Sequence, residues 1–396
     1  MTSSHIGVFN AGSSSIKFAI RRIGPGLPLV IRGQVEAIGV APRLLLKDAG
    51  GAQVSEQQWP NVDFHHETAT REIIGVIGQQ LGENAIGAVG HRVVHGGTRH
   101  VRPERVDPAV LADLETLVPL APLHQPHNLA PIRAMAAAMP GLPQVACFDT
   151  SFHAGEPLIA RRYALPRALE KEGVLRYGFH GISYEFVSRQ LHSLAPELAA
   201  GRVVIAHLGN GASLCAVQDG RSVATTMGFT AIEGLMMGTR CGSIDPGVLI
   251  YLMNQHGMGA RELEELVYRR SGLLGVSGIS SDMRALRSST EPAAAEAIAL
   301  FVYRAVREIG SMAAALGGLD GLVFTGGIGE HDPAARSDIV AGCAWLGLKL
   351  DPALNAAGAS GRISSNQSSG EVWVIPTDEE RMIAEHTASV LGISTD

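Results

Sequence analysis

The sequence predicts an α/β protein whose two halves resemble each other. Residues 7–20 and 203–217 each have the pattern of a strand, a polar turn containing glycine, and a second strand. Ser15 in the first turn and Ser213 in the second are half of the 396-residue chain apart. Between and after these hairpins, helical and strand patterns alternate, which indicates helices layered on sheets.

The first hairpin is defined by the strand that leaves its turn. Ile16, Phe18 and Ile20 alternate with other residues, and this period of two is typical of a strand. The turn itself, residues 12–15, offers backbone N–H groups and small hydroxyl side chains, which suit phosphate oxygens. An ordinary hairpin explains one such turn, but a second copy at Gly209 and Gly211 favours a nucleotide clamped between duplicated domains.

A third glycine turn, residues 326–330, follows the apolar strand pattern of residues 322–325. Asp332 and Pro333 fit the N-cap and first position of the helix after it. A glycine turn between a strand end and a helix N-terminus favours a purine, a ribose or a phosphate. Capping and periodicity predict further elements: a helix from Asp107-Pro108, a helix from about Leu129 to before Pro140, a strand from Gln144 to Phe148, a helix after Pro292 and a helix from about Arg381.

Composition narrows the classes of partner. The net charge is −6 and no basic block is present, which argues against nucleic acid and anionic membranes. Without a signal peptide or a long apolar segment, we expect a soluble, cytoplasmic protein. Its four separated cysteines suit reduced thiols. Closely spaced histidine pairs lie among glycine and proline without an accompanying H-E-x-x-H motif, so a zinc site is not predicted.

Seven motifs, spread from end to end of the chain, resemble the signatures of the acetate kinase family. They are Asn10-Ala-Gly-Ser-Ser-Ser-Ile-Lys17, Gly90-His-Arg-Val-Val-His-Gly-Gly97, Arg176-Tyr-Gly-Phe-His-Gly-Ile-Ser183, His207-Leu-Gly-Asn-Gly-Ala-Ser213, Gly234-Leu-Met-Met-Gly-Thr-Arg240, Gly326-Gly-Ile-Gly-Glu330 and Thr377-Asp-Glu-Glu380.

The resemblance implies two duplicated RNase H-like domains, as in actin, Hsp70 and sugar kinases, with a nucleotide cleft between them. It implies an N-terminal domain of residues 1–149 completed by about 381–396, a nucleotide-binding domain of residues 150–380, and a homodimer. The implied reaction is reversible transfer of the ATP γ-phosphoryl group to acetate. An Hsp70-like, nucleotide-gated binding module is the alternative from a different functional class. That alternative does not explain the presence of Arg92 and Arg240 in glycine-rich motifs.

Acetate is ionised at neutral pH, so its phosphorylation needs positioning and cationic stabilisation rather than a general base. By resemblance, Arg92 and Arg240 bind the acid and stabilise the transferring phosphoryl group, and His180 stabilises the transition state. Asp149 becomes the catalytic aspartate, which we expect to orient the acid or hold the cation by charge. The residues alone leave other interpretations open: ion-paired arginines, a core histidine, and an aspartate that caps a turn.

Metal and nucleotide contacts are also implied by resemblance. Asn10 and Glu379 match the positions that bind Mg²⁺, with Mn²⁺ as a substitute, although the sequence alone does not separate Glu379 from Glu380. Lys17 is expected to reach the phosphates, or else to be a solvated strand lysine. The expected nucleotide contacts are His207, Leu208, Gly209, Asn210, Gly211, Asp282, Met283, Arg284, Gly326, Gly327, Ile328, Gly329 and Glu330.

The pocket for the methyl group of the acid is expected from Val94, Leu123, Phe179 and Ala231. Ala231 stands where the family pattern has proline, and the loss of ring atoms predicts better tolerance of propionate. A propionate or butyrate kinase is therefore the alternative within the family. Residues 241–243 read Cys-Gly-Ser instead of the usual Ser-Gly-Asp, so we expect Arg240 to be less firmly held.

Overall fold

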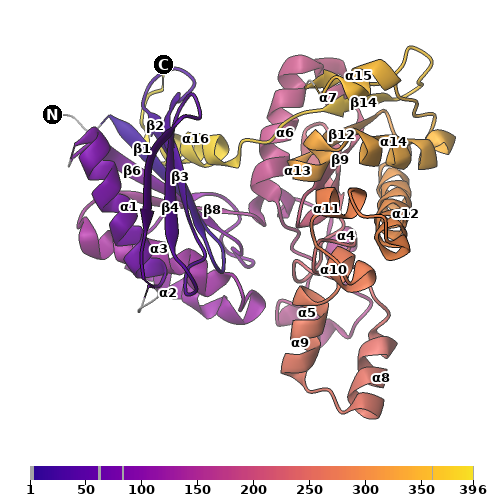
Figure 1. Cartoon of the computed structure of the whole chain (residues 1–396), viewed down its shortest axis with the longest axis horizontal. Helices are drawn as coiled ribbons and strands as arrows, with labels where there is room; N and C mark the ends of the chain where they lie inside the picture. Colours follow the sequence, from indigo (N-terminus) through magenta and orange to yellow (C-terminus); the bar gives the residue numbers. More distant parts are fainter. Residues whose placement is uncertain (1–3, 61–63, 83, 359, 396) are drawn as a thin grey trace. The chain divides into compact units, whose positions relative to one another are not determined.

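The computed structural model describes residues 4–60, 64–82, 84–358 and 360–395. The chain divides into two compact units: unit 1 is Met1–Ser151 with Asp378–Asp396, and unit 2 is Phe152–Thr377 (Figure 1). The domain boundaries predicted from the sequence, after residue 149 and near residue 381, remain predictions, because compactness alone does not show that each part folds independently.

Unit 1 is built on an eight-stranded sheet in the order β5-β4-β3-β2-β1-β6-β8-β7. The strands are β1 His5–Ala11, β2 Ile16–Arg22, β3 Leu29–Glu36, β4 Arg43–Asp48, β5 Gln53–Gln58, β6 Ile86–Val93, β7 Glu104–Arg105 and β8 Gln144–Phe148. β1 pairs antiparallel with β2 and parallel with β6, which in turn is parallel to β8. The predicted hairpin of residues 7–20 and the strand at 144–148 are confirmed.

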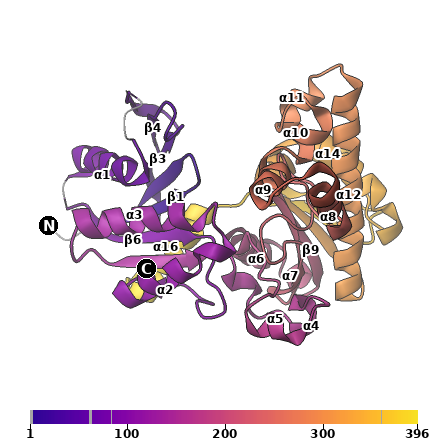
Figure 2. The same cartoon turned by 90° about the horizontal axis from the view of Figure 1, so that it is seen from below.

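Helices cover both faces of this sheet. They are α1 His66–Leu81, α2 Pro108–Thr116, η1 Val118–Leu120, α3 Gln125–Ala138, η2 Ser151–His153 at the unit boundary, and α16 Glu379–Leu391. Figure 2 shows α1 and α3 along one face, where Phe9, Phe18 and Ile73 share a buried core. α16 lies on the opposite face, where a Cβ on Gly90 would collide with Ile383 of this helix.

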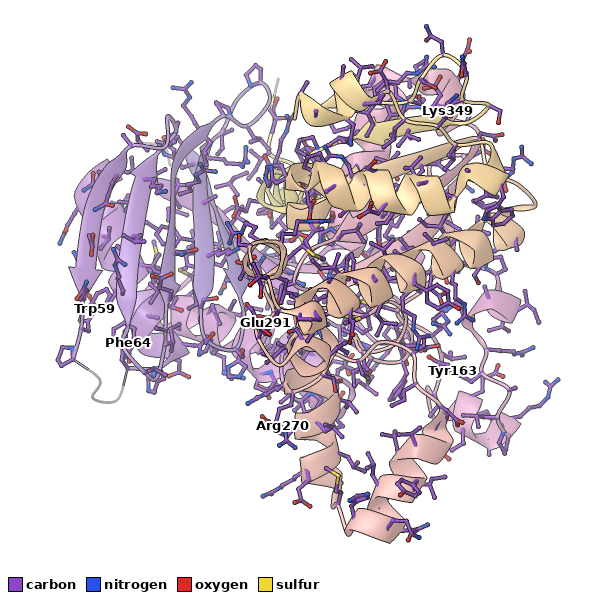
Figure 3. The ribbon with its side chains drawn as sticks, turned by 45° about the vertical axis from the view of Figure 1, so that its right-hand side comes forward. Trp59, Phe64, Tyr163, Arg270, Glu291 and Lys349 are labelled. Carbon is purple, nitrogen blue, oxygen red and sulfur yellow. The ribbon has the colours of Figure 1, made fainter. Side chains whose placement is uncertain are left out.

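Two aromatic rings mark one end of unit 1. Trp59 follows β5 and Phe64 precedes α1, and Figure 3 shows them at the same end of the sheet. Their ring centroids are 4.8 Å apart with the planes tilted by 32°, a separation within the favourable range for aromatic pairs.

Unit 2 contains a six-stranded sheet in the order β11-β10-β9-β12-β14-β13. Its strands are β9 Arg202–Leu208, β10 Ala212–Gln218, β11 Arg221–Thr225, β12 Gly321–Thr325, β13 Gly361–Arg362 and β14 Glu371–Val374. Its helices are α4 Leu158–Arg161, α5 Arg167–Lys171, α6 Gly181–Leu194, α7 Pro196–Ala199, α8 Pro246–His256, α9 Ala260–Arg269, α10 Gly272–Ser277, α11 Met283–Arg287, α12 Pro292–Leu316, α13 Gly326–His331, α14 Pro333–Gly342, η3 Ala344–Leu346 and α15 Pro352–Ala356. α6 and α12 lie on opposite sides of β9 and β12 (Figures 1 and 2).

The two sheets share one strand order. In unit 1 the run β3-β2-β1-β6-β8 begins with antiparallel pairs and ends with parallel ones, and β11-β10-β9-β12-β14 in unit 2 does the same. The prediction of an α/β fold with duplicated halves is therefore confirmed. The described part of the chain contains no helix that is both long and apolar enough to cross a membrane.

Three boundaries of helices can be compared with those that local sequence signals predicted. Asp332 caps α14 through the N–H of Ala335, and Pro333 is its first residue, as predicted. The helix expected from Leu129 begins earlier, at Gln125, because Pro126 occupies a first-turn position where no N–H partner is needed. The glycine turn at 326–330 was predicted as a loop and is a one-turn helix, α13, instead.

Candidate active site

Arg92 and Asp149 form the central ion pair of unit 1. Arg92 lies on β6 and Asp149 directly follows β8, the neighbouring parallel strand. Arg92 Nε donates to Asp149 Oδ1 at 2.8 Å, and Nη2 donates to Oδ2 at 2.5 Å. The Asp149 side chain is 2% exposed and that of Arg92 23%, so this is a largely buried bidentate pair.

The surroundings of Arg92 keep it charged. Burial opposes the charge, but the Asp149 carboxylate, with a smaller contribution from Glu379, raises the pKa of Arg92 above its usual value. Arg92 Nη1 also donates to Asn10 Oδ1 at 3.0 Å. Three of the five guanidinium N–H groups are used in these bonds, and no other residue in the described part of the chain accepts from the remaining two, which are available to an anion.

Asn10, Arg92, Asp149 and Glu379 gather on one face of the unit 1 sheet. Asn10 lies opposite Lys17 in the β1–β2 hairpin, and Glu379 is the first residue of α16, which covers that face. Amide and carboxylate oxygens are the donors that Mg²⁺ prefers, so the residue types fit this ion. No group of three or more His, Cys, Asp or Glu side chains in the described ranges is arranged to bind a metal.

Glu379 and Glu380 have different surroundings. Burial raises the pKa of Glu380, and Asp378 adds to this effect, which favours its neutral form. Glu380 lines a cavity of about 300 Å³ together with Lys17, Arg32 and Lys47. Glu379 instead lies close enough to Arg92 to influence its charge. This difference favours Glu379 over Glu380 as a metal ligand.

Side-chain amides join the segment that carries Val94 to the segment that follows Leu123. The Val94 N–H donates to Asn128 Oδ1 at 2.8 Å. Gln125, two residues after Leu123, donates to the carbonyl of His95 at 3.1 Å. Val94 is buried and Leu123 half-buried, so unit 1 supplies two of the four residues predicted for the methyl pocket. Phe179 and Ala231 belong to unit 2.

In unit 2, His180 occupies the N-cap position of α6 in the left-handed region, with φ 59° and ψ 19°. A non-glycine residue rarely adopts this conformation, and such residues cluster at functional sites. Its Nδ1 lies 2.8 Å from Ser213 Oγ, and Ser213 Oγ lies 2.5 Å from the Tyr184 hydroxyl. The ring of His180 stacks on His207, with centroids 4.3 Å apart.

Arg240 and His180 converge on Gly211. A Cβ on Gly211 would lie 2.7 Å from Arg240 Nη2 and 3.3 Å from His180 Nε2, so any other residue here would displace the end of the Arg240 side chain. Arg240 Nη1 donates to the carbonyl of Ala231 at 2.6 Å. Ser243, which replaces the family aspartate, instead accepts the N–H of Gly234 at 3.1 Å. Arg240 therefore has a neutral carbonyl partner in this loop, and its weaker fixation remains a prediction.

The loop of residues 226–234, which carries Ala231, is held by a group that the sequence did not indicate. Tyr163, labelled in Figure 3, donates to Glu233 Oε2 at 2.7 Å and accepts the N–H of Phe229 at 2.7 Å. Arg176 donates to Glu233 Oε1 at 2.7 Å and to the Thr226 carbonyl at 3.2 Å. Burial raises the pKa of Tyr163, so its hydroxyl keeps the proton that it donates.

A cavity of about 810 Å³ in unit 2 is lined by seven of the thirteen predicted nucleotide contacts. Its lining includes the predicted residues Gly209, Asn210, Asp282, Met283, Arg284, Gly327 and Ile328. It also includes residues that the sequence did not single out as contacts: Ser281, Arg287, His331, Asp332, Pro333 and Ala334. This volume and lining suit a nucleoside with its phosphates at a glycine-rich edge.

Six predicted nucleotide contacts are not in the lining of this cavity: His207, Leu208, Gly211, Gly326, Gly329 and Glu330. Leu208 is buried in β9, and His207 bonds Ser183 and stacks on His180. The Glu330 carboxylate turns inward, where Oε1 accepts the N–H groups of Gly326 at 2.8 Å and Thr377 at 3.2 Å. Glu330 therefore holds the glycine turn in place, a function that spacing along the chain does not reveal.

We compared the sequence and the structure with those of known proteins. Residues 5–385 match the model of the acetokinase family. An acetate kinase of Rhodopseudomonas palustris (strain ATCC BAA-98 / CGA009) is 52% identical over 384 residues, covering 96% of each chain. Among solved structures, the acetate kinase of Porphyromonas gingivalis has a TM-score of 0.89 at 38% identity, and a propionate kinase of Francisella tularensis has 0.92 at 35%. Both cover 98% of this chain and 100% of their own. As its motifs predicted, this chain belongs to the acetokinase family.

Proposed function

We propose that this chain is an acetate kinase, which transfers the γ-phosphoryl group of ATP to acetate and forms acetyl phosphate and ADP. Family membership supports the proposal, and the observation that carries it is the half-buried Arg92, fixed by the buried Asp149 with two N–H groups available for an anion. The reaction runs in both directions, because acyl phosphates hold their phosphoryl group loosely. The alternative of a nucleotide-gated binding module does not explain why this arginine is arranged to bind an anion.

The acid binds at Arg92 in this proposal. Both oxygens of Asp149 bond the guanidinium, so Asp149 orients Arg92 and is not needed as a base for an acid that is already ionised. The carboxylate of acetate takes the remaining N–H groups of Arg92. The apolar residues proposed for its methyl group are Val94 and Leu123 in unit 1, and Phe179 and Ala231 in unit 2.

Phosphoryl transfer is assisted by cations and hydrogen-bond donors. Arg240 and His180 converge at Gly211, where their donors stabilise charge on the transferring group. Lys17 neutralises phosphate charge from the β1–β2 hairpin. Asn10 and Glu379 hold Mg²⁺ or Mn²⁺, which when bound neutralises phosphate charge and helps to orient the phosphates. The nucleoside lies in the cavity lined by Asn210, Met283 and Ile328.

A second copy of the chain is the proposed macromolecular partner. α8 has no buried residue, and its Ile250, Tyr251 and Met253 are each about half exposed. Figure 1 shows α8 and α9 projecting from the rest of unit 2. Several exposed large apolar side chains on one projecting helix are typical of a protein interface. We expect a homodimer in the cytoplasm that buries α8.

Ala231 favours a second acid. The Ala231 carbonyl holds Arg240, and a proline at this position would retain that carbonyl while adding ring atoms. Alanine therefore enlarges the pocket without releasing the arginine. Propionate, and less well butyrate, are expected to be alternative substrates.

Hydroxylamine trapping tests the proposed function. Purified protein is incubated with Mg²⁺, ATP and each of the one- to five-carbon acids, and acyl hydroxamate is measured. Acetate is expected to give product, and Arg92→Leu is expected to abolish it, whereas Arg99→Leu, at a 70% exposed side chain, is expected to have little effect. If no acid gives hydroxamate, the proposed function is wrong.

A further inference from the structure

A buried polar chain that the reaction does not use lies beneath the segment that carries His180. The Ser222 hydroxyl donates to Glu156 Oε1 at 2.6 Å, and Ser222 Oγ is 2.8 Å from His153 Nδ1. His153 Nε2 is 3.0 Å from the carbonyl oxygen of Phe179, the residue before His180. The His153 side chain is 0% exposed and that of Glu156 1%, so the chain is shielded from water.

The direction of the last hydrogen bond follows from the chemistry of its acceptor. A carbonyl oxygen only accepts, so His153 Nε2 must carry the hydrogen. His153 Nδ1 faces Ser222 Oγ at 2.8 Å and Glu156 Oε1 at 3.3 Å. Ser222 and Glu156 therefore hold the ring in the orientation that directs Nε2 toward the Phe179 carbonyl.

The ring of His153 is also fixed by packing. It makes edge contacts with Phe152 and Tyr184, with centroid distances of 5.7 and 5.6 Å. Gly178 has φ +73°, and a Cβ there would lie 2.5 Å from His153 Cδ2. The backbone of Gly178 thus packs directly against the imidazole. A displacement of the ring is therefore expected to displace residues 178–180.

His180 is held on its other side by Ser213 and the fully buried Tyr184. Burial raises the pKa of Tyr184 well above its usual value, so its hydroxyl remains protonated. His180, with its unusual left-handed backbone, is consequently held at two points. Ser213 binds its ring, and His153 binds the carbonyl of the preceding residue. This arrangement limits both the position and the rotation of the imidazole.

The chain has a cost in stability. Glu156 Oε2 is buried without a hydrogen-bond partner in the described part of the protein. Leaving a buried polar atom unpaired is unfavourable, and apolar residues of similar size often replace such networks without loss of stability. The arrangement is therefore better explained by the geometry that it imposes on Phe179 and His180 than by stabilisation of the core.

We propose that His153, with its ring orientation set by Ser222 and Glu156, is a positioning residue for His180. It acts through the Phe179 carbonyl and touches neither substrate nor metal. The inference rests on the proposed role of His180 in phosphoryl transfer. It adds three residues to the reaction that the motifs did not indicate as functional: His153, Glu156 and Ser222.

A double-mutant cycle tests this proposal by comparing His153→Leu, His180→Ala and the double variant. If His153 acts through His180, His153→Leu lowers kcat about tenfold or more alone but less than about twofold when His180 is already alanine. KM for ATP and acetate changes little in His153→Leu. Equal losses in both backgrounds would show a merely structural role and overturn the proposal. If His180→Ala alone leaves kcat unchanged, the proposed role of His180 fails instead, which separates the two outcomes.

Conservative variants sharpen the result. His153→Gln retains an N–H donor for Phe179 and is expected to recover most of the kcat lost in His153→Leu. Ser222→Ala is expected to lower kcat, whereas Ser188→Ala, at a buried serine of α6 whose Oγ has no partner in the described structure, is the matched control. If His153→Leu folds poorly because Glu156 loses its partner, His153→Leu/Glu156→Leu removes both groups. A natural kcat in that folded double variant would also overturn the proposal.

Discussion

Arg92 and Asp149 share two parallel hydrogen bonds, of 2.8 and 2.5 Å, at the ends of neighbouring parallel strands. A bidentate pair fixes the plane of the guanidinium as well as its position. Asp149 therefore determines in which direction the remaining N–H groups of Arg92 point, and this relationship leads to the first prediction.

Asp149→Asn retains the size of the side chain but removes its charge and one of its two acceptors. We expect a loss of about 10²-fold or more in kcat/KM for acetate, because small displacements of a positioning group can cost that much. The thermal midpoint should also fall, since Arg92 is left largely buried without a counterion. Glu115→Gln, at a solvent-exposed pair with Arg133, is the control and should be close to neutral. Near-normal turnover of Asp149→Asn would contradict the prediction.

Tyr163→Phe removes the hydroxyl that joins Phe229 to Glu233. The half-buried N–H of Phe229 loses its acceptor, at an expected cost of about 1–3 kcal/mol. The loop that carries Ala231 should loosen, so KM for the acid is expected to rise while KM for ATP stays the same. Tyr303→Phe, at an exposed position of α12, provides the matched control for steady-state kinetics and thermal unfolding. An unchanged KM for acetate would show that the loop does not depend on this hydroxyl.

Two buried histidines predict how stability depends on pH. Burial lowers the pKa of His91 to about 4, with a hydrogen bond to Gln144 opposing it in part, and burial lowers the pKa of His95 to about 4. In the unfolded chain a histidine takes up its proton near pH 6.5. The unfolded state therefore binds more protons between pH 6.5 and 4, so stability is complete above this window and falls as the pH decreases through it.

His91→Gln removes one of these groups and retains an N–H donor for Gln144. Between pH 6 and 5, we expect the slope of unfolding free energy against pH to become shallower by up to about 1.4 kcal/mol per pH unit. Urea unfolding at several pH values measures this slope. Above pH 7.5 the slopes of the two proteins should agree, which serves as the internal control. Equal slopes in the acidic window would refute the prediction.

Ala231→Pro tests acid selectivity. One methylene in an apolar pocket is worth about 1–3 kcal/mol, or roughly 10- to 200-fold. We expect the ratio of kcat/KM for propionate to that for acetate to fall by a factor in this range in the proline variant. The rate with acetate should be retained, because the carbonyl that binds Arg240 remains. An unchanged ratio would mean that residue 231 does not limit the acid.

Ile250→Glu places a charge on the exposed apolar face of α8. If this face joins two copies of the chain, sedimentation velocity should show a shift from dimer toward monomer. Val54→Glu, at an exposed position on β5 of unit 1, should leave the assembly unchanged. A natural protein that sediments as a monomer at all concentrations would rule out the proposed dimer.

Local signals in the sequence predicted the hairpins well. The alternation of Ile16, Phe18 and Ile20 and the small residues at each tip fix strand, turn and register within a few residues of chain. The cap formed by Asp332 and Pro333 is equally local. α13 was missed because its glycines disfavour a helix, and the bond from the Gly326 N–H to Glu330 that supports its first turn is not visible in composition.

Contacts between residues that are far apart in the chain could not be predicted from the sequence. The motifs indicated Arg92 and Asp149 separately, but their bidentate pairing depends on β6 lying beside β8. Tyr163, Arg176 and Glu233 come from three separate loops, and none has a local pattern that marks it as part of one group. Arg176 stands within a motif, so its position could have suggested importance but not its partner.

The shared strand order has a consequence for where chemistry arises in each half. The second rung from the tip of the first hairpin pairs Asn10 with Lys17, and the equivalent rung of the second hairpin pairs His207 with Ser213. In each half a helix starts beside that rung with a candidate residue, α16 with Glu379 and α6 with His180 at its cap. Each half thus offers the same location for candidate reactive groups, which holds an amide and a lysine in the first hairpin and a histidine and a hydroxyl in the second. In other proteins assembled from this repeat, the penultimate rung of each hairpin is the first place to look for catalytic side chains.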